Sequence, residues 1–133
     1  MKIGLDIMGG DFAPEATLAG AFLASEQMGA GIELVLIGDK NKIEKAIEKE
    51  GVSKDNFEIV HADASIENGE NPAKAFAKKT NSSINKGYSL LSEGKIQGFA
   101  SAGSTGAMMV GAMYTIKSLP GIIRPVITAA VPQ

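Results

Sequence analysis

Short apolar runs alternate with segments of helical periodicity along most of this chain. Runs typical of buried strands cover residues 2–7, 32–37, 57–60 and 96–100. Between them, apolar residues recur three and four positions apart, as on one face of a helix. Because this alternation is typical of a parallel sheet with right-handed crossovers, we predict a three-layer α/β/α, Rossmann-like sandwich. With 133 residues, the chain has room for a single domain of this kind.

Local signals place several helix ends. Pro14 suits a first helical turn, and Asp39 is well placed to cap a helix that Gly51 ends. We expect a further strand at 126–131, after Arg124 and Pro125. For the helix after Pro14, the four-residue spacing predicts a buried stripe of Leu18, Ala19, Phe22 and Leu23.

Composition excludes several classes of function. The chain has no cysteine, so thiol nucleophiles, disulfides and thiolate metal sites are ruled out. A net charge of -2, with two tyrosines and five phenylalanines for base stacking, argues against nucleic acid as a partner. The apolar runs are too short for a signal sequence or a membrane span. We therefore expect a cytoplasmic protein.

The 101–106 loop, Ser-Ala-Gly-Ser-Thr-Gly, joins the strand-like run 96–100 to a Met-rich helical segment. Free backbone N–H groups and the positive end of the helix dipole meet at such a junction, which makes it suited to an anion. Its glycines allow close approach, and its hydroxyls can donate to phosphate oxygens. The simpler alternative is that Ser104 or Thr105 only caps the helix.

Ligands of parallel sheets bind beyond the carboxyl ends of the strands. In this chain those ends carry residues 6–11, Gly38-Asp39, His61 and the 101–106 loop. Asp6 and Asp11 flank two glycines, so they can orient a donor hydroxyl or a lysine, bind a metal, or serve as turn residues. No spacing typical of metal ligands supports a metal. A lone histidine at a strand end is more often structural than catalytic.

Ordinary nucleotide-binding patterns are missing. Neither G-x-G-x-x-G after the first strand nor the phosphate loop ending in Gly-Lys-Ser/Thr occurs. These absences weigh against a dinucleotide- or nucleotide-binding enzyme, although that reading stays open.

Four blocks of sequence carry a family resemblance. They are Asp6-x-Met8-Gly9-Gly10-Asp11, Lys79-x-Asn81-Ser82-Ser83, Ser101-Ala102-Gly103-x-Thr105-Gly106-Ala107 and Gly121-Ile122-x-Arg124-Pro125. In this order they resemble the bacterial phosphate acyltransferases of fatty acid and phospholipid synthesis. The resemblance runs along the whole chain but covers only the amino-terminal part of that longer family. The chain departs from the family pattern at Thr80, Ser104 and Ile123.

The resemblance implies transfer of a fatty acyl group from acyl carrier protein to inorganic phosphate, with no cofactor. It also implies a homodimer, a fold similar to phosphotransacetylases and isocitrate dehydrogenases, and peripheral membrane association only through parts outside this chain. A fragment of this length is expected to be inactive alone. A non-catalytic assembly half is the remaining alternative.

With this resemblance, we predict roles for twelve residues. Phosphate is itself a nucleophile, so the site must position it and neutralise charge rather than supply a serine or cysteine nucleophile. Asp6, Asp11 and Lys79 are the predicted catalytic residues, with Lys79 as a counter-charge to phosphate. The predicted substrate-binding residues are Gly9, Gly10, Ser82, Ser83, Ser101, Gly103, Ser104, Thr105 and Gly106.

The Met-rich segment after the loop allows two interpretations. Its apolar residues are spaced as on a helix, which favours ordinary core packing: Met108, Met109, Ala112, Met113 and Ile116. Because methionine adapts to irregular apolar ligands, lining for an acyl chain is the alternative.

Overall fold

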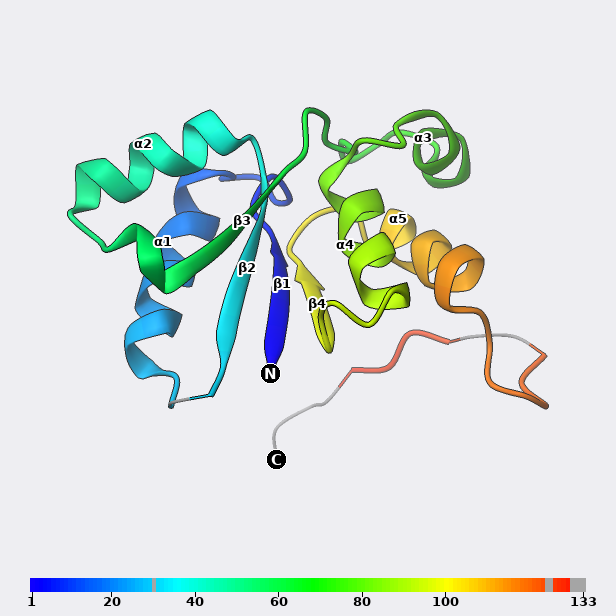
Figure 1. The fold of residues 1–133 in the computed structure, drawn as a ribbon. Helices are drawn as coiled ribbons and strands as arrows, with labels where there is room; N and C mark the ends of the chain where they lie inside the picture. Colours follow the sequence, from blue (N-terminus) through cyan, green and yellow to red (C-terminus); the bar gives the residue numbers. More distant parts are fainter. Residues whose placement is uncertain (30, 124–125, 130–133) are drawn as a thin grey trace.

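A computed structural model describes residues 1–29, 31–123 and 126–129 of the chain. Its centre is a parallel sheet with the strand order β3-β2-β1-β4. The strands are β1 (Lys2–Asp6), β2 (Glu33–Gly38), β3 (Phe57–His61) and β4 (Gly98–Ser101). Because the first strand lies between the second and the fourth, the carboxyl ends of distant segments meet at one edge of the sheet (Figure 1).

Helices cover both faces of the sheet, as predicted (Figure 1). One face carries α1 (Glu15–Gln27) and α2 (Lys40–Glu50). The other carries α3 (Pro72–Lys78), α4 (Ser83–Ser92) and α5 (Thr105–Gly111), which runs on into a π-helical turn (Ala112–Ile116). A short 3-10 turn (Lys54–Asn56) precedes β3. The predicted three-layer α/β/α arrangement is confirmed.

Strand β2 shows why both layers form. Its residues Leu34, Val35, Leu36 and Ile37 are all buried. Leu34 and Leu36 pack in the core beneath α1 and α2, whereas Val35 and Ile37 pack with Ile96 in a second cluster. A strand that is apolar at every position must be covered on both faces to remove these side chains from water.

The caps of α2 form as predicted. The Asp39 side chain accepts hydrogen bonds from Asn41 N–H at 2.9 Å and Lys42 N–H at 3.3 Å. Gly51 ends the helix in the left-handed conformation, with φ of 66°. Both signals act within one helical turn, which is why they can be recognised from local sequence.

Two expectations differ from the structure. Leu18 and Phe22 are buried, but Ala19 is exposed and Leu23 is 55% exposed, so the predicted stripe on α1 was half wrong. The helix buries Ala21 beside Leu18 and Phe22 instead, because that side faces the sheet. The predicted strand at 126–131 was also wrong where it can be checked: 126–129 have no regular structure, and 130–131, like Arg124 and Pro125, lie outside the described residues.

Close contacts between helices and aromatic rings position the second layer. A Cβ on Gly87 of α4 would lie 2.2 Å from the Phe99 ring, and one on Gly111 would lie 2.3 Å from the Tyr88 ring. The rings of Tyr88 and Phe99 pack edge to face at 5.4 Å. These glycines let α4 approach β4, and α5 approach α4, closer than a side chain would permit.

Replacing Gly87 by alanine should therefore destabilise the fold despite the higher helix propensity of alanine. Overpacking against Phe99 costs about 1–3 kcal/mol. Gly20 of α1 is the matched control, because nothing lies within 4 Å of its would-be Cβ. Gly20→Ala should stabilise by up to about 1 kcal/mol. Urea unfolding measures both, and equal effects from the two variants would contradict the packing described for Gly87.

Candidate functional site

The loops that follow β1 and β4 are joined through a buried carboxylate. Asp6 and Ser101 are register partners at the ends of these strands. Asp6 is only 3% exposed. Its Oδ2 accepts a hydrogen bond from Ser101 Oγ at 2.7 Å, and its Oδ1 accepts one from Met8 N–H at 3.0 Å. A buried carboxylate needs such donors, so both loops are held to this side chain.

Ser101 also forms a hydrogen bond within the 101–106 loop. Its Oγ accepts a hydrogen bond from Gly103 N–H at 3.0 Å while it donates to Asp6. The Ser101 hydroxyl is therefore already engaged as both donor and acceptor. In this arrangement it shapes the 101–106 loop from inside.

Two glycines make the contact between the loops possible. A Cβ on Gly9 would lie 2.4 Å from Asp6 Oδ2, 2.7 Å from Ser101 Oγ and 2.9 Å from Gly103 N. A Cβ on Gly103 would lie 3.0 Å from the Gly9 Cα. Since real Cβ atoms do not come so near backbone and buried polar atoms, position 9 requires glycine, and a Cβ at position 103 would press against Gly9. The structure thus brings together the predicted residues Asp6, Gly9, Ser101 and Gly103. Gly10 also lies at this junction, facing Ala102.

The end of the glycine loop starts α5. Ser104 is the N-cap, and its Oγ accepts a hydrogen bond from Ala107 N–H at 3.3 Å. Thr105 is exposed at the first helical position. A Cβ on Gly106 would lie 2.7 Å from the Pro72 ring, so the first turns of α5 and α3 touch. The capping role considered for Ser104 is real, and it leaves Thr105 facing solvent.

Lys79 lies at the end of α3 and holds a neighbouring loop. Its ammonium forms an ion pair with Glu70 and donates a hydrogen bond to the Ser65 carbonyl at 2.8 Å. Glu70 also accepts from Glu67 N–H at 2.7 Å. The hydrogen bond from Lys79, and then that from Glu67, lowers the pKa of the Glu70 carboxyl below its usual range. Lys79 therefore pins the loop between β3 and α3.

Asp11 reaches the same loop from the other side. Its Oδ1 accepts a hydrogen bond from Asn68 Nδ2 at 3.1 Å, and both residues are exposed. Asp11 is thus apart from Asp6, although the two share one loop in sequence. The pair of aspartates does not form a single carboxylate cluster.

Ser82 and Ser83 are buried at the start of α4. Ser82 caps the helix, with its Oγ accepting from Asn85 N–H at 3.3 Å. Ser83 N–H donates to the Ala64 carbonyl at 3.1 Å, and among the described residues its Oγ has no partner. Both serines are at most 1% exposed. The structure therefore places them beneath the loop that Lys79 holds, away from solvent.

His61 has a local contact at the end of β3. Its Nδ1 accepts a hydrogen bond from Lys40 N–H at 3.3 Å, at the start of α2. Across residues 1–29, 31–123 and 126–129, no three His, Asp or Glu side chains converge as a metal site would require. Within the same ranges, no helix has the length and apolar character needed to cross a bilayer.

Sequence reasoning missed three residues that position this edge of the sheet. Glu70 and Asn68 belong to none of the patterns described above, yet they engage Lys79 and Asp11. Tyr88 donates its hydroxyl to the Met108 carbonyl at 2.6 Å and so fixes α5, while burial raises the pKa of its phenol. No local pattern signals such contacts, because they join segments far apart in sequence.

Comparison with known proteins places this chain in a family. The family described as "Fatty acid synthesis protein" matches residues 1–133. The chain belongs to this family. The phosphate acyltransferase of Dictyoglomus turgidum is 42% identical over 132 residues, and that of Clostridioides difficile is 37% identical over 133 residues. These alignments cover 99% and 100% of this chain but only 39% and 38% of the relatives, so the family member described here spans about two fifths of their length.

A solved structure agrees with the fold. The EutD phosphotransacetylase from Staphylococcus aureus is similar, with a TM-score of 0.59 and 25% sequence identity. The match covers 93% of this family member and 40% of the phosphotransacetylase chain. The expected likeness to phosphotransacetylases is confirmed at the level of architecture.

Asp6→Asn should destabilise the protein and loosen the glycine loop. The amide has one acceptor oxygen, so it cannot accept both from Ser101 and from Met8. Loss of a hydrogen bond to a buried charged group costs about 1.5–3 kcal/mol. Asp11→Asn is the matched control, because Asp11 is exposed and accepts a single side-chain hydrogen bond, from Asn68, within the described part of the chain. It should change stability by less than about 0.5 kcal/mol. Urea unfolding measures the stability of both variants, and amide exchange at Gly103 measures how firmly the glycine loop is held. Equal effects of the two variants would contradict the role of Asp6 in holding the two loops together.

Acidification should release the loop that Lys79 holds. The pKa of Glu70 is lowered in the folded state, so its contribution to stability is present above the unfolded value near 4.5 and disappears as pH falls through the lower folded value. Relative to the intrinsic exchange rate at each pH, the protection of the amides of residues 65–71 should therefore fall below about pH 4.5 before that of the sheet. Glu70→Gln should remove this fall in protection. Protection that stays constant with pH in the unmodified protein would contradict the pairing.

Proposed function

We propose that residues 1–133 form the amino-terminal domain of a longer enzyme that transfers a fatty acyl group from acyl carrier protein to inorganic phosphate. The product would be an acyl phosphate for phospholipid synthesis. The family assignment and the names of the relatives support this proposal. A homodimer in the cytoplasm, which the resemblance to the family implies, belongs to the same proposal.

The observation that carries the proposal is the meeting of the loops after β1 and β4 at the carboxyl edge of the sheet. The Asp6–Ser101 hydrogen bond and the contact of Gly9 with Gly103 give the 101–106 loop a defined shape. Thr105 is exposed at the point where this loop becomes a helix. Backbone N–H groups at such a point favour an anion, and the Thr105 hydroxyl can add a further donor.

The proposed reaction needs placement rather than a protein nucleophile. A phosphate oxygen attacks the thioester carbonyl of the donor, a C–O bond forms, and the C–S bond breaks as the carrier thiol leaves. The protein then has to hold phosphate in line and stabilise the developing oxyanion. Ser101 is poorly suited to covalent catalysis in this arrangement, because its oxygen is occupied by Gly103 N–H and Asp6.

The predicted catalytic residues take different roles in this proposal. Asp6 is a positioning residue that sets the loop through Ser101. Lys79 can neutralise phosphate if it exchanges its partner Glu70 for the substrate, which would couple phosphate binding to movement of the 65–71 loop. Asp11, exposed beside Asn68, is available to a donor group that enters from solvent.

Thr105→Asp should abolish phosphate binding at the glycine loop. It places a fixed negative charge beside the proposed anion, and like charges in contact weaken binding by at least about tenfold. Asn56→Asp is the matched control, since it adds the same charge at an exposed position preceding β3, at the opposite end of the strands. Phosphate titration followed by ³¹P NMR measures both variants. Unchanged binding in Thr105→Asp, or equal weakening in both, would refute the proposed phosphate site.

A further inference from the structure

An exposed apolar stripe begins at the glycine loop and follows the helix away from it. Thr105 is exposed, and Met109, Met113 and Ile116 are 38%, 41% and 45% exposed. Steps of four residues keep Thr105, Met109 and Met113 on one side of the helical segment, and Ile116 ends the π-helical turn. The structure thus corrects the expectation of core packing for Met109, Met113 and Ile116, whereas Met108 and Ala112 pack against the core as expected.

The opposite side of α5 packs against the rest of the protein. Ala107 is 0% exposed, and Gly111 lies against the Tyr88 ring. The Tyr88 hydroxyl also holds the Met108 carbonyl. Since these contacts fix the orientation of α5, the methionine side cannot turn inward without breaking them. The apolar stripe is therefore a stable property of the fold.

We propose that this stripe holds the fatty acyl chain of the substrate whose phosphate end lies at the 101–106 loop. The inference rests on the proposed function and adds a location for the chain. Its ligand class is an amphiphile with a phosphate or acyl phosphate head and one unbranched hydrocarbon tail. The stripe has the same order, with a polar residue at Thr105 followed by apolar residues at Met109, Met113 and Ile116.

The length of the stripe suits such a tail. Eleven helical steps separate Thr105 from Ile116, which at about 1.5 Å per residue is roughly 16 Å. One leaflet of a bilayer, half of a hydrocarbon core about 30 Å thick, is spanned by one acyl chain of similar length. A fatty acyl chain anchored at the loop would therefore reach the end of the π-helical turn.

The composition of the stripe also suits a tail of variable shape. Methionine has three rotatable bonds and a polarizable sulfur, so it adapts to flexible apolar ligands. Tyr114 is 62% exposed but lies on another side of the helix, with its ring 6.4 Å from that of the core residue Phe76. Further exposed apolar residues follow in sequence, at Leu119, Ile122, Ile123, Val126 and Ile127.

Alkyl phosphates of increasing length test this proposal directly. Butyl, octyl and dodecyl phosphate, each below its aggregation concentration, are titrated into the chain by calorimetry. Affinity should rise about twofold per methylene, because a fully buried methylene is worth about fourfold and the stripe is open on one side. The rise should level off once the tail is about as long as one leaflet. An affinity independent of tail length would overturn the proposal.

Matched variants locate the effect. Met109→Ser with Met113→Ser should flatten the dependence on tail length while inorganic phosphate binds as before. Leu23→Ser is the control, because Leu23 is 55% exposed on α1, across the sheet from α5 (Figure 1). Met113→Gln serves if the double variant fails to fold, and it should lower the dodecyl affinity alone. A dependence that survives both methionine variants, or one lost equally in Leu23→Ser, would refute the stripe.

Further measurements distinguish a fatty acyl chain from other occupants of the stripe. They also distinguish failure of this proposal from failure of the proposed function. If light scattering shows a dimer that the methionine variants dissociate, with no dependence on tail length, a second copy covers the stripe and the proposal fails. If the dependence disappears in a protein extended to the length of the relatives, a protein segment covers it, and the proposal fails as well. If inorganic phosphate itself does not bind, the proposed function is contradicted. The dependence of alkyl phosphate affinity on tail length would still test whether the stripe binds an acyl chain.

Discussion

The hydrogen bond between Asp6 and Ser101 is the interaction on which the rest of the site depends. It joins two adjacent strands whose residues are 95 positions apart in sequence. Because the Asp6 carboxylate is buried, its oxygens need the hydrogen bonds from Ser101 and Met8 in place of water. Gly9 and Gly103 leave room for this arrangement. The loops after β1 and β4 are therefore one structural unit, although they are distant in sequence.

Sequence alone predicted those parts of the fold that depend on local or periodic signals. The alternation of apolar runs and helices predicted the layered parallel sheet, and the caps Asp39 and Gly51 were recognisable because each acts within one turn. Which side of a helix is exposed was harder to predict. Leu23 and Met113 fit an apolar period, but which side meets the core is decided by distant contacts such as Gly111 with Tyr88.

The same distinction applies to the candidate site. The glycine loop could be recognised from its own residues. Lys79 and Asp11, in contrast, acquire their partners Glu70 and Asn68 only when the chain between β3 and α3 folds back over the sheet edge.

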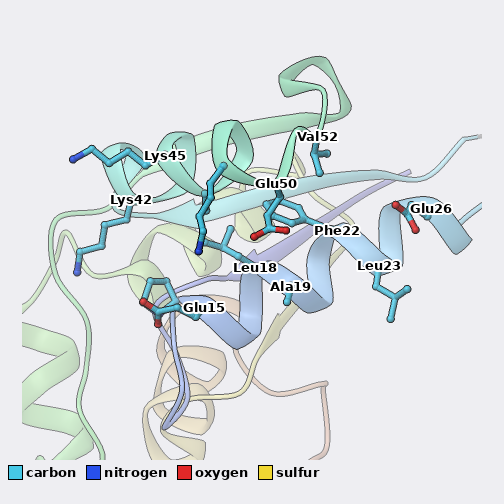
Figure 2. A pocket seen from close by; sticks show the side chains of 13 residues that line it. Glu15, Leu18, Ala19, Phe22, Leu23, Glu26, Lys42, Lys45, Glu50 and Val52 are labelled. Atoms are coloured by element: carbon cyan, nitrogen blue, oxygen red, sulfur yellow. The ribbon is translucent and has the colours of Figure 1, made fainter.

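A separate groove lies between α1 and α2, on the opposite face of the sheet from α4 and α5. It has a volume of about 720 Å³ and is lined by lysines and glutamates in equal number above an apolar floor (Figure 2). Because its positive and negative side chains balance, the groove favours neither an anionic nor a cationic partner.

The position of β1 in the sheet also affects how the protein is made. This strand is made before the other three strands of the sheet, and β4 completes its second side only some 95 residues later. At synthesis rates of about 5–20 residues per second, the delay is roughly 5–20 s. During this time one edge of β1 has no neighbour, and unpaired edges invite pairing with other chains. The edge of β1 that ends at Asp6 is thus open to such pairing until β4 has been made.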